Sequence, residues 1–530
     1  MDAVTPGPAA DAWDQTLAAA LLGADRAGPA QAGSDLVALE PGLDAGAALL
    51  ARLAAQGVHH IAGTGFAPEA LVPVPERQPA GPECPPAAAS RLALLLSMGN
   101  RERLAEWCDL AGAAGLRAPA WLLPALAARR SDLPEPIGRV AGAELAWLDR
   151  AAAGGAGSEA AEAATPAEPA WTEGNPAERE AAFRAFRARD AAAARAALEA
   201  GWRAEKAELR ARFVAALAVG LSEADGPFLE TCLDDRSVGV RTEAQNLLPR
   251  LPASAFAARM AARARAALRI EAKRKLFRTT HTLVVTLPEE DPALARDGVT
   301  PRSHDPQGSG VRAGLLRDVL AAAPLQAFAE HPPRRWIELV LQSDWSAEIR
   351  TGLLAAARRA GDSAWSEALT TVLGEACLGH LPGVEPSEPL VTTWAMAAAM
   401  LPAADWETLV AILIRGGSVT SVIAHLGHAP ARFSESFTRA LLGWLAGLIQ
   451  HGAVPDPPWK LAHLIDGLAE RAWPSREAAT AAGALRDRFP QGGDRYLASA
   501  FARLAETLDL RAAMRRDFAP DQTVSETARR

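Results

Sequence analysis

The stretch from Ser222 to Pro252, SEADGPFLETCLDDRSVGVRTEAQNLLPRLP, constrains the fold of this chain more than any other part of it. Apolar residues recur there at the helical period in two short runs, which an Asp-Asp turn separates. Pro252 ends the second run, because proline has no amide hydrogen with which to continue a helix. The stretch therefore predicts two short helices joined by a turn, with these apolar residues on their faces: Phe228, Leu229, Cys232, Leu233, Val240, Ala244, Leu247, Leu248 and Leu251.

The turn of this hairpin, Asp-Asp-Arg followed by Val-Arg, resembles that of a HEAT repeat. Asp234 or Asp235 can accept hydrogen bonds from the free amides at the start of the second helix. Arg241 can reach a carboxylate of a neighbouring repeat, because stacked hairpins contact one another. A second copy of the motif begins near Trp336. Asp344 stands in its turn, and the letters IRT around Arg350 repeat the VRT around Arg241. Two such copies are typical of a divergent solenoid.

Composition favours a helical fold for the whole chain. With 530 residues the chain is too long for one compact core, so two or more domains or an extended array are expected. Alanine, the strongest helix former, dominates, whereas runs of Val and Ile are scarce. We therefore predict an all-α protein, a HEAT-like helical-hairpin solenoid that follows an N-terminal helical region.

Composition breaks and turn residues divide the chain further. Asn100 can cap the helix that contains Trp107. The run TLVVTL at 282–287 is the one strand-like segment, which needs another extended segment as its partner or crosses the fold as buried extended chain. The predicted order is a helical region over 1–152, a flexible linker over 153–175, HEAT-like repeats over 176–280, an extended or loop crossing over 281–311, C-terminal helical repeats over 312–518 and a disordered tail over 519–530.

Charge and cysteine content exclude several classes of protein. A net charge of −8 argues against a general affinity for nucleic acid or membranes. The four cysteines lie far apart and form no C-x-x-C pair, which favours buried thiols in a reducing compartment. The N-terminus is acidic and lacks the apolar core of a signal peptide, and no apolar run is long enough to span a membrane. We therefore expect a cytoplasmic protein.

No motif in the chain predicts catalysis, a cofactor or a metal. There is no phosphate-binding loop of the form G-x-x-x-x-G-K-[ST] and no G-x-S-x-G nucleophile elbow. His425 and His428 stand three residues apart, but Gly427 and Pro430 weaken the helix that would present them together. We therefore expect a non-enzymatic protein without a cofactor.

The densest charge lies between Arg259 and Arg278, where Glu271 is the single acid. On a helix, Arg265, Arg269 and Lys273 would line up at intervals of four residues and repel one another. The stripe is interpreted either as a surface for an anionic partner or as a solvated helix face that pairs with acids of the neighbouring repeat. The candidate anionic-partner residues are Arg259, Arg263, Arg265, Arg269, Lys273 and Arg274.

The accumulated pattern resembles a bacterial family, domain of unknown function 5691. The resemblance spans most of the chain and rests on Trp13 with ALLGADR at 20–26, GLRAPAWLLPAL at 115–126, Trp202 with the block at 220–241, and LLPRLP at 247–252. It assigns no catalytic residue. It implies a scaffold protein of the kind often encoded beside MoxR-type AAA ATPases, SWIM zinc-finger proteins and von Willebrand A-type proteins.

These observations predict binding rather than catalysis. The expected function is that of a helical-repeat scaffold for a protein partner, such as an AAA ATPase or a von Willebrand A-type protein. The alternative is a HEAT-like protein that binds nucleic acid through the basic stripe at 259–278. A third class, an enzyme with a dispersed site, would show convergent carboxylates or histidines with perturbed pKa values in one pocket.

Overall fold

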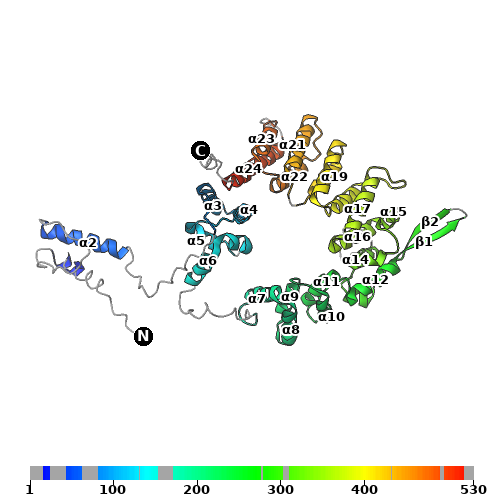
Figure 1. The fold of residues 1–530 in the computed structure, drawn as a ribbon, viewed down its shortest axis with the longest axis horizontal. Coiled ribbons are helices and arrows are strands. Elements are labelled where there is room, and N and C mark those ends of the chain that lie inside the picture. The colour runs from blue at the N-terminus through cyan, green and yellow to red at the C-terminus, as the bar shows by residue number, and fades with distance from the viewer. Residues whose placement is uncertain are drawn as a thin grey trace, which may run out of the picture. The chain divides into compact units, whose positions relative to one another are not determined.

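The computed structural model describes residues 16–18, 20–23, 43–61, 81–130, 132–152, 171–275, 278–301, 310–430, 432–489 and 494–518. The chain divides into two compact units, Met1–Glu162 and Ala163–Arg530, and most of the described residues are helical (Figure 1). None of the helices in these described ranges has the length and apolar character needed to cross a membrane.

The first unit contains α2 (Ala45–Ile61), α3 (Pro86–Met98), α4 (Arg101–Ala113), α5 (Leu123–Ala127) and α6 (Pro134–Ala152). Helix α4 packs against α3 and α6, and α5 packs against α6. The Asn100 side chain accepts a hydrogen bond of 3.1 Å from the Arg103 amide, which confirms the predicted cap of α4. Trp107 is fully buried and donates its indole N–H to the carbonyl of Ala88 at 3.0 Å, so it ties α4 to α3.

The second unit follows in chain order through a long series of helices (Figure 1). Its helices are α7 (Pro176–Arg189), α8 (Ala191–Gly201), α9 (Ala207–Ala216), α10 (Gly226–Cys232), α11 (Val238–Leu247), α12 (Ala255–Ala267), α13 (Pro292–Arg296), α14 (Val311–Ala322), α15 (Pro333–Leu341), α16 (Ser346–Ala360), α17 (Ser363–Cys377), α18 (Glu388–Ala398), α19 (Ala403–Arg415), α20 (Val419–Gly427), α21 (Glu435–Gln450), α22 (Pro458–Arg471), α23 (Arg476–Arg486) and α24 (Arg495–Asp517).

Helices α10 and α11 confirm the hairpin predicted from the sequence, and all nine apolar residues assigned to its faces are buried. The second helix ends at Leu247, earlier than Pro252, because a 3₁₀ turn that contains Pro249 follows it. In the equivalent pair, α15 and α16, Ile349 takes the place of Val240, and both side chains are completely buried.

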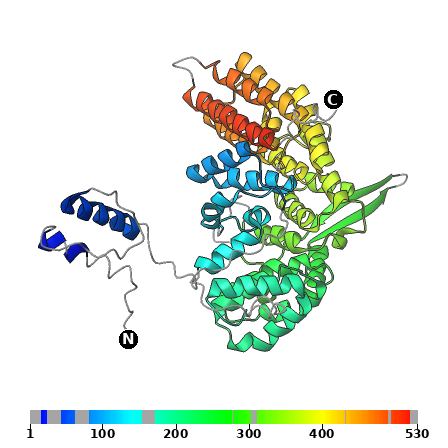
Figure 2. The same ribbon diagram turned by 60° about the vertical axis from the view of Figure 1, so that its left-hand side comes forward.

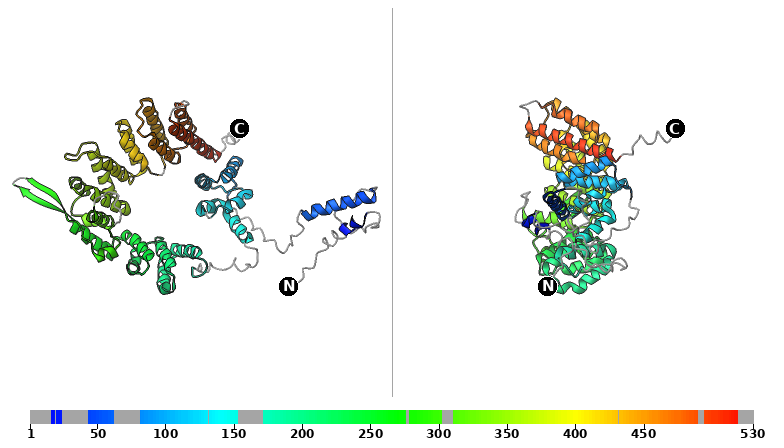
Figure 3. Two further views of the ribbon diagram at one scale, coloured as in Figure 1. Left: turned by 180° about the vertical axis from the view of Figure 1, so that it is seen from behind. Right: turned by 90° about the vertical axis from the view of Figure 1, so that its left-hand side faces the viewer.

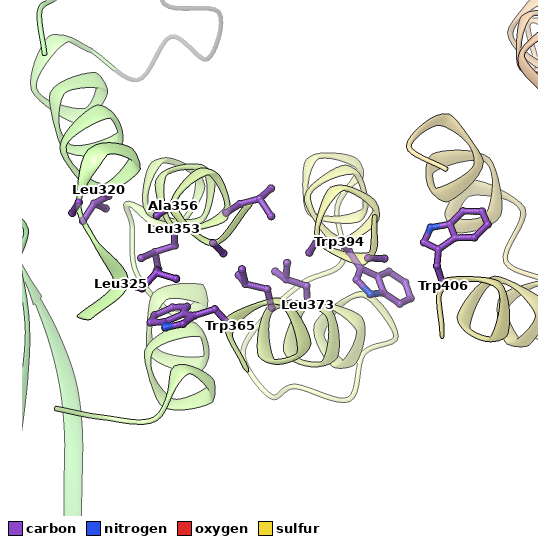
Figure 4. Packing of buried hydrophobic residues seen from close by; sticks show 14 of the residues in the cluster. Leu320, Leu325, Leu353, Ala356, Trp365, Leu373, Trp394 and Trp406 are labelled. Carbon is purple, nitrogen blue, oxygen red and sulfur yellow. The ribbon is translucent and has the colours of Figure 1, made fainter. Parts of the chain in front are cut away.

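The packing of the second unit is regular along the chain. Many of its helices contact the helix two positions further on: α12, α14, α16, α18, α20, α22 and α24 form one such series. Helix α15 contacts α17, and α19, α21 and α23 form a further series. Figure 4 shows part of this core, whose buried side chains follow one another along the helices from Leu320 through Leu325, Leu353, Ala356, Trp365, Leu373 and Trp394 to Trp406. Most of the contacts that bury these helices are therefore made with near neighbours in the sequence.

The sheet in the described part of the chain is one antiparallel hairpin, β1 (Leu268–Lys275) and β2 (Arg278–Val285). It extends away from the helices of its unit (Figures 2 and 3). The helix expected to run through 259–278 ends at Ala267, so that part of the prediction is wrong. Most of the strand-like run at 282–287 lies in β2, which pairs with β1. The first of the two alternatives, pairing with another extended segment, is therefore correct. The short helix α13 lies within the stretch 281–311 that was predicted to be extended or loop.

Candidate interaction surfaces

The predicted basic stripe is divided between two elements. Arg259, Arg263 and Arg265 lie on α12, whereas Arg269, Lys273 and Arg274 lie on β1. Arg265, Arg269 and Lys273 therefore do not form the single helical row that their spacing suggested, and no helical repulsion needs to be compensated. The chain turns into a strand because Leu268 and Ile270 pair with Val285 and Leu283, which gives the hairpin an apolar base packed against the helices.

The first two residues of the stripe are bound to an acid of the fold. Arg259 contacts Asp297 at 2.7 Å and Arg263 contacts it at 2.6 Å, while Arg259 also reaches Glu230 at 3.1 Å. Burial alone would raise the pKa of Asp297, but the hydrogen bonds and charges of the two arginines outweigh it and hold the pKa below its ordinary value. Arg259 and Arg263 thus connect α12 to the residue after α13, and their charge is already neutralised.

The remaining four residues of the stripe, Arg265, Arg269, Lys273 and Arg274, are exposed. Arg269 pairs with Glu271 at 2.9 Å, and its side chain remains 64% accessible. Among the residues that the structure describes, Arg265, Lys273 and Arg274 have no ion-pair partner. These cations, at and beyond the end of α12, are the part of the stripe that is open to an anion.

The turn residues of the repeat motif act within the fold. Asp235 accepts a hydrogen bond of 2.8 Å from the amide of Ser237, the N-cap residue of α11, so it fixes the turn but does not cap the free amides of the helix. Asp234 instead contacts Arg296 at 2.7 Å, and this hydrogen bond lowers the pKa of Asp234. Arg241 does not reach a carboxylate of the neighbouring repeat, because its guanidinium donates to the carbonyls of Asp235 and Arg236 in its own turn.

The second copy of the motif differs from the first. Arg350 is buried and donates to the Ser346 hydroxyl at 3.1 Å, and burial lowers the pKa of its guanidinium. Asp344 is exposed in the turn before α16. Arg241 is the fourth residue of α11 and Arg350 the fifth residue of α16, so the two arginines stand near the start of their helices but have different partners.

The most deeply buried ion pair of the second unit was not predicted. Arg187 on α7 contacts Asp225 at 3.1 Å, and both side chains are completely inaccessible. The Arg187 guanidinium also donates to the carbonyls of Val219, Leu217, Gly220 and Ala191. Burial alone would raise the pKa of Asp225, but hydrogen bonds from Arg187, from the Ser222 amide and from Arg195 lower it. The pair fixes the loop between α9 and α10 on α7.

Of the two histidines considered as a metal-binding pair, His425 is part of the core, whereas His428 is exposed after the end of α20. His425 is fully buried with its ring 4.7 Å from that of Trp394, and burial lowers its pKa to about 4. Its Nδ1 lies 2.7 Å from the carbonyl of Ser421. Burial raises the pKa of the Cys84 and Cys377 thiols to about 11, so they stay protonated at neutral pH. The described residues contain no group of three potential metal ligands.

An aromatic groove lies between α22 and α24 in the C-terminal part of the second unit. It has a volume of about 370 Å³, and Trp459 and Tyr496 line it with 55% and 69% of their surfaces exposed. Arg495 adds a guanidinium group and His463 an imidazole. The Arg503 guanidinium forms an ion pair with Asp466 at 2.8 Å. Trp459 therefore differs from Trp394 and Trp406, which are buried in the core.

A sequence profile described as "Family of unknown function (DUF5691)" matches residues 15–518. No curated protein and no solved structure matches the chain.

Proposed function

The chain belongs to the DUF5691 family, whose description assigns no activity, and on that premise we propose that it is a non-enzymatic scaffold that binds a protein partner. The observation that carries this proposal is the groove between α22 and α24 with its exposed Trp459 and Tyr496. Tryptophan, tyrosine and arginine contribute most of the binding energy at protein interfaces, and all three line this groove.

The proposed architecture is a HEAT-like solenoid. The contacts between helices two positions apart, from α12 to α24, support it, because stacked hairpins pack in this way. Such a stack presents a long surface whose units contact mainly their neighbours. A fold of this kind hosts many functions, so the proposal rests on the groove and not on the architecture alone.

The groove also defines the chemistry of the partner. Exposed aromatic rings with Arg495 beside them suit a segment that supplies apolar side chains and a carboxylate. The resemblance to DUF5691 implies a partner from a MoxR-type AAA ATPase or von Willebrand A-type system, and we propose this class as the first to test.

The test is purification of the tagged full-length protein from its native host after nuclease treatment, followed by mass spectrometry. We expect a protein partner in stoichiometric amount. If no protein co-purifies, but nucleic acid does when nuclease is omitted and is then released by moderate salt, the alternative of a nucleic-acid-binding protein replaces the scaffold.

A further inference from the structure

We propose that the β1–β2 hairpin binds the phosphate backbone of duplex DNA, a function separate from that of the α22–α24 groove. The charge balance of this hairpin differs from that of the whole chain: between 268 and 285 there are five basic residues and one acidic residue, whereas the whole chain has a net charge of −8. The local field at the hairpin therefore favours a polyanion although the molecule as a whole does not.

The shape of the hairpin suits a DNA groove. Each strand has eight residues, so the ribbon is about 26 Å long. It projects from the helices of its unit (Figures 1 to 3) and, among the described residues, its two strands pair only with each other. The major groove of B-form DNA admits a two-stranded ribbon of this kind, whereas the major groove of an RNA helix is too narrow for side chains to enter.

The exposed cations are placed for two phosphate strands. Successive residues of a strand point to opposite faces, so Lys273 shares a face with Arg269, and Arg274 lies on the other. Both Lys273 and Arg274 are exposed and have no acidic partner among the described residues. A ribbon that enters the groove with one edge toward the bases has a phosphate strand beside each of its faces, and each face of this hairpin carries a cation for one of them.

The apolar base of the hairpin packs against the helices, so only the outer part of the hairpin is available to DNA. Ile270, Leu283 and Val285 are partly buried against the core, and His281 lies 3.0 Å from the Arg335 guanidinium on α15. This anchoring holds the hairpin on the helices. The outer part, where Lys273 and Arg274 stand, has exposed Thr279 and Thr280 as its cross-strand neighbours, so the ribbon is polar on both faces there.

The experiment is a fluorescence anisotropy titration of a labelled duplex of about 20 base pairs with the full-length protein, repeated from about 50 to 200 mM salt. We expect wild-type protein to bind with an affinity that falls as salt rises. Loss of two phosphate contacts in the double variant K273A/R274A should weaken binding roughly 100-fold at about 50 mM salt and reduce the slope of log K against log salt by about 1.8.

Two matched variants complete the experiment. K460A/R476A removes the same charge from exposed positions on α22 and α23, and it should bind like wild type. K273R/R274K keeps the charge of the hairpin, and it should retain the salt slope. The proposal is overturned if wild type does not bind the duplex, if both alanine double variants lose affinity equally, or if polyglutamate of equal charge competes as well as DNA does.

Discussion

At the residue scale, polar side chains hold the fold both within single turns and between distant segments of the chain. Asn100 caps α4 by accepting a hydrogen bond from the amide three residues later, and Asp235 accepts one from the amide of Ser237, the N-cap residue of α11. The pair of Arg187 and Asp225 joins α7 to the loop between α9 and α10, 38 residues later in the chain, and no local pattern marks it. Arg241 was assigned a distant carboxylate, but the carbonyls of its own turn were closer.

Breaking the Arg187–Asp225 pair should destabilise the second unit strongly. Arg187→Ala leaves the Asp225 carboxylate buried with only Arg195 as its ion-pair partner, so we expect a loss of about 3–5 kcal/mol in the free energy of unfolding. The control is Arg184→Ala, which removes an exposed pair with Glu180 and should cost less than about 1 kcal/mol. Urea unfolding followed by circular dichroism measures both, and similar losses would show that the buried pair has no special role.

The titration of His425 should make stability depend on pH in a defined window. Its pKa is lowered from 6.5 to about 4 by burial, so the unfolded chain binds the proton more readily than the folded one. The stability from the neutral imidazole is complete above pH 6.5 and is lost as pH falls toward 4, by on the order of 3 kcal/mol. His425→Gln does not titrate, so the difference in stability between wild type and this variant should shrink from pH 7 to pH 4.5. A constant difference would contradict the account.

Two buried carboxylates affect the stability of the fold at a lower pH than His425 does. The pKa values of Asp225 and Asp297 are lowered, so the stability they contribute is present above their ordinary pKa and is lost as pH falls through the folded value. Asp297→Asn should therefore reduce the melting temperature at neutral pH and flatten its fall under acid conditions below about pH 4. Thermal melts across that range check both effects. An unchanged acid slope would mean that Asp297 is not among the groups that titrate on unfolding.

At the element scale, helices with a clear apolar period were predictable, and the hairpin was not. Arg265, Arg269 and Lys273 recur every four residues, a spacing that suits one face of a helix and also alternate positions of a strand. The segment with Arg269 and Lys273 forms a strand and not a helix because it pairs with β2, which supplies β-branched partners at its end. This partner lies later in the chain, so the charge pattern alone could not identify it.

Helices α14 and α16 approach each other closely at Gly352, which gives a prediction about their packing. A Cβ at Gly352 on α16 would lie 2.7 Å from both the Arg317 carbonyl and the Leu320 Cβ on α14, so Gly352→Ala must push the two helices apart. We expect a loss of about 1–3 kcal/mol. Gly443→Ala on α21 meets nothing within 4 Å and should stabilise that helix by roughly 0.5–1 kcal/mol. Equal effects in urea unfolding would show that the α14–α16 contact is not close-packed.

At the scale of the whole molecule, the sequence predicted a mostly helical protein with neighbouring helices packed together, because alanine content and apolar period act throughout the chain. It did not predict the groove. Trp459 and Tyr496 lie on different helices, and an aromatic residue within a helical pattern resembles a core residue until the packing of α22 against α24 leaves it exposed. The proposed scaffold function therefore depends on a surface that only the three-dimensional arrangement defines.

The most direct test of that function is the amount of partner that co-purifies with the double variant W459A/Y496A, relative to wild type, from the native host. The control W121A removes an aromatic side chain that is 65% exposed in the first unit. We predict that the partner bound to wild type and to W121A falls at least about tenfold with the groove variant, because loss of one interface hot spot costs 2 kcal/mol or more. A groove variant that retains the partner in full would contradict the proposal that α22 and α24 form the binding surface.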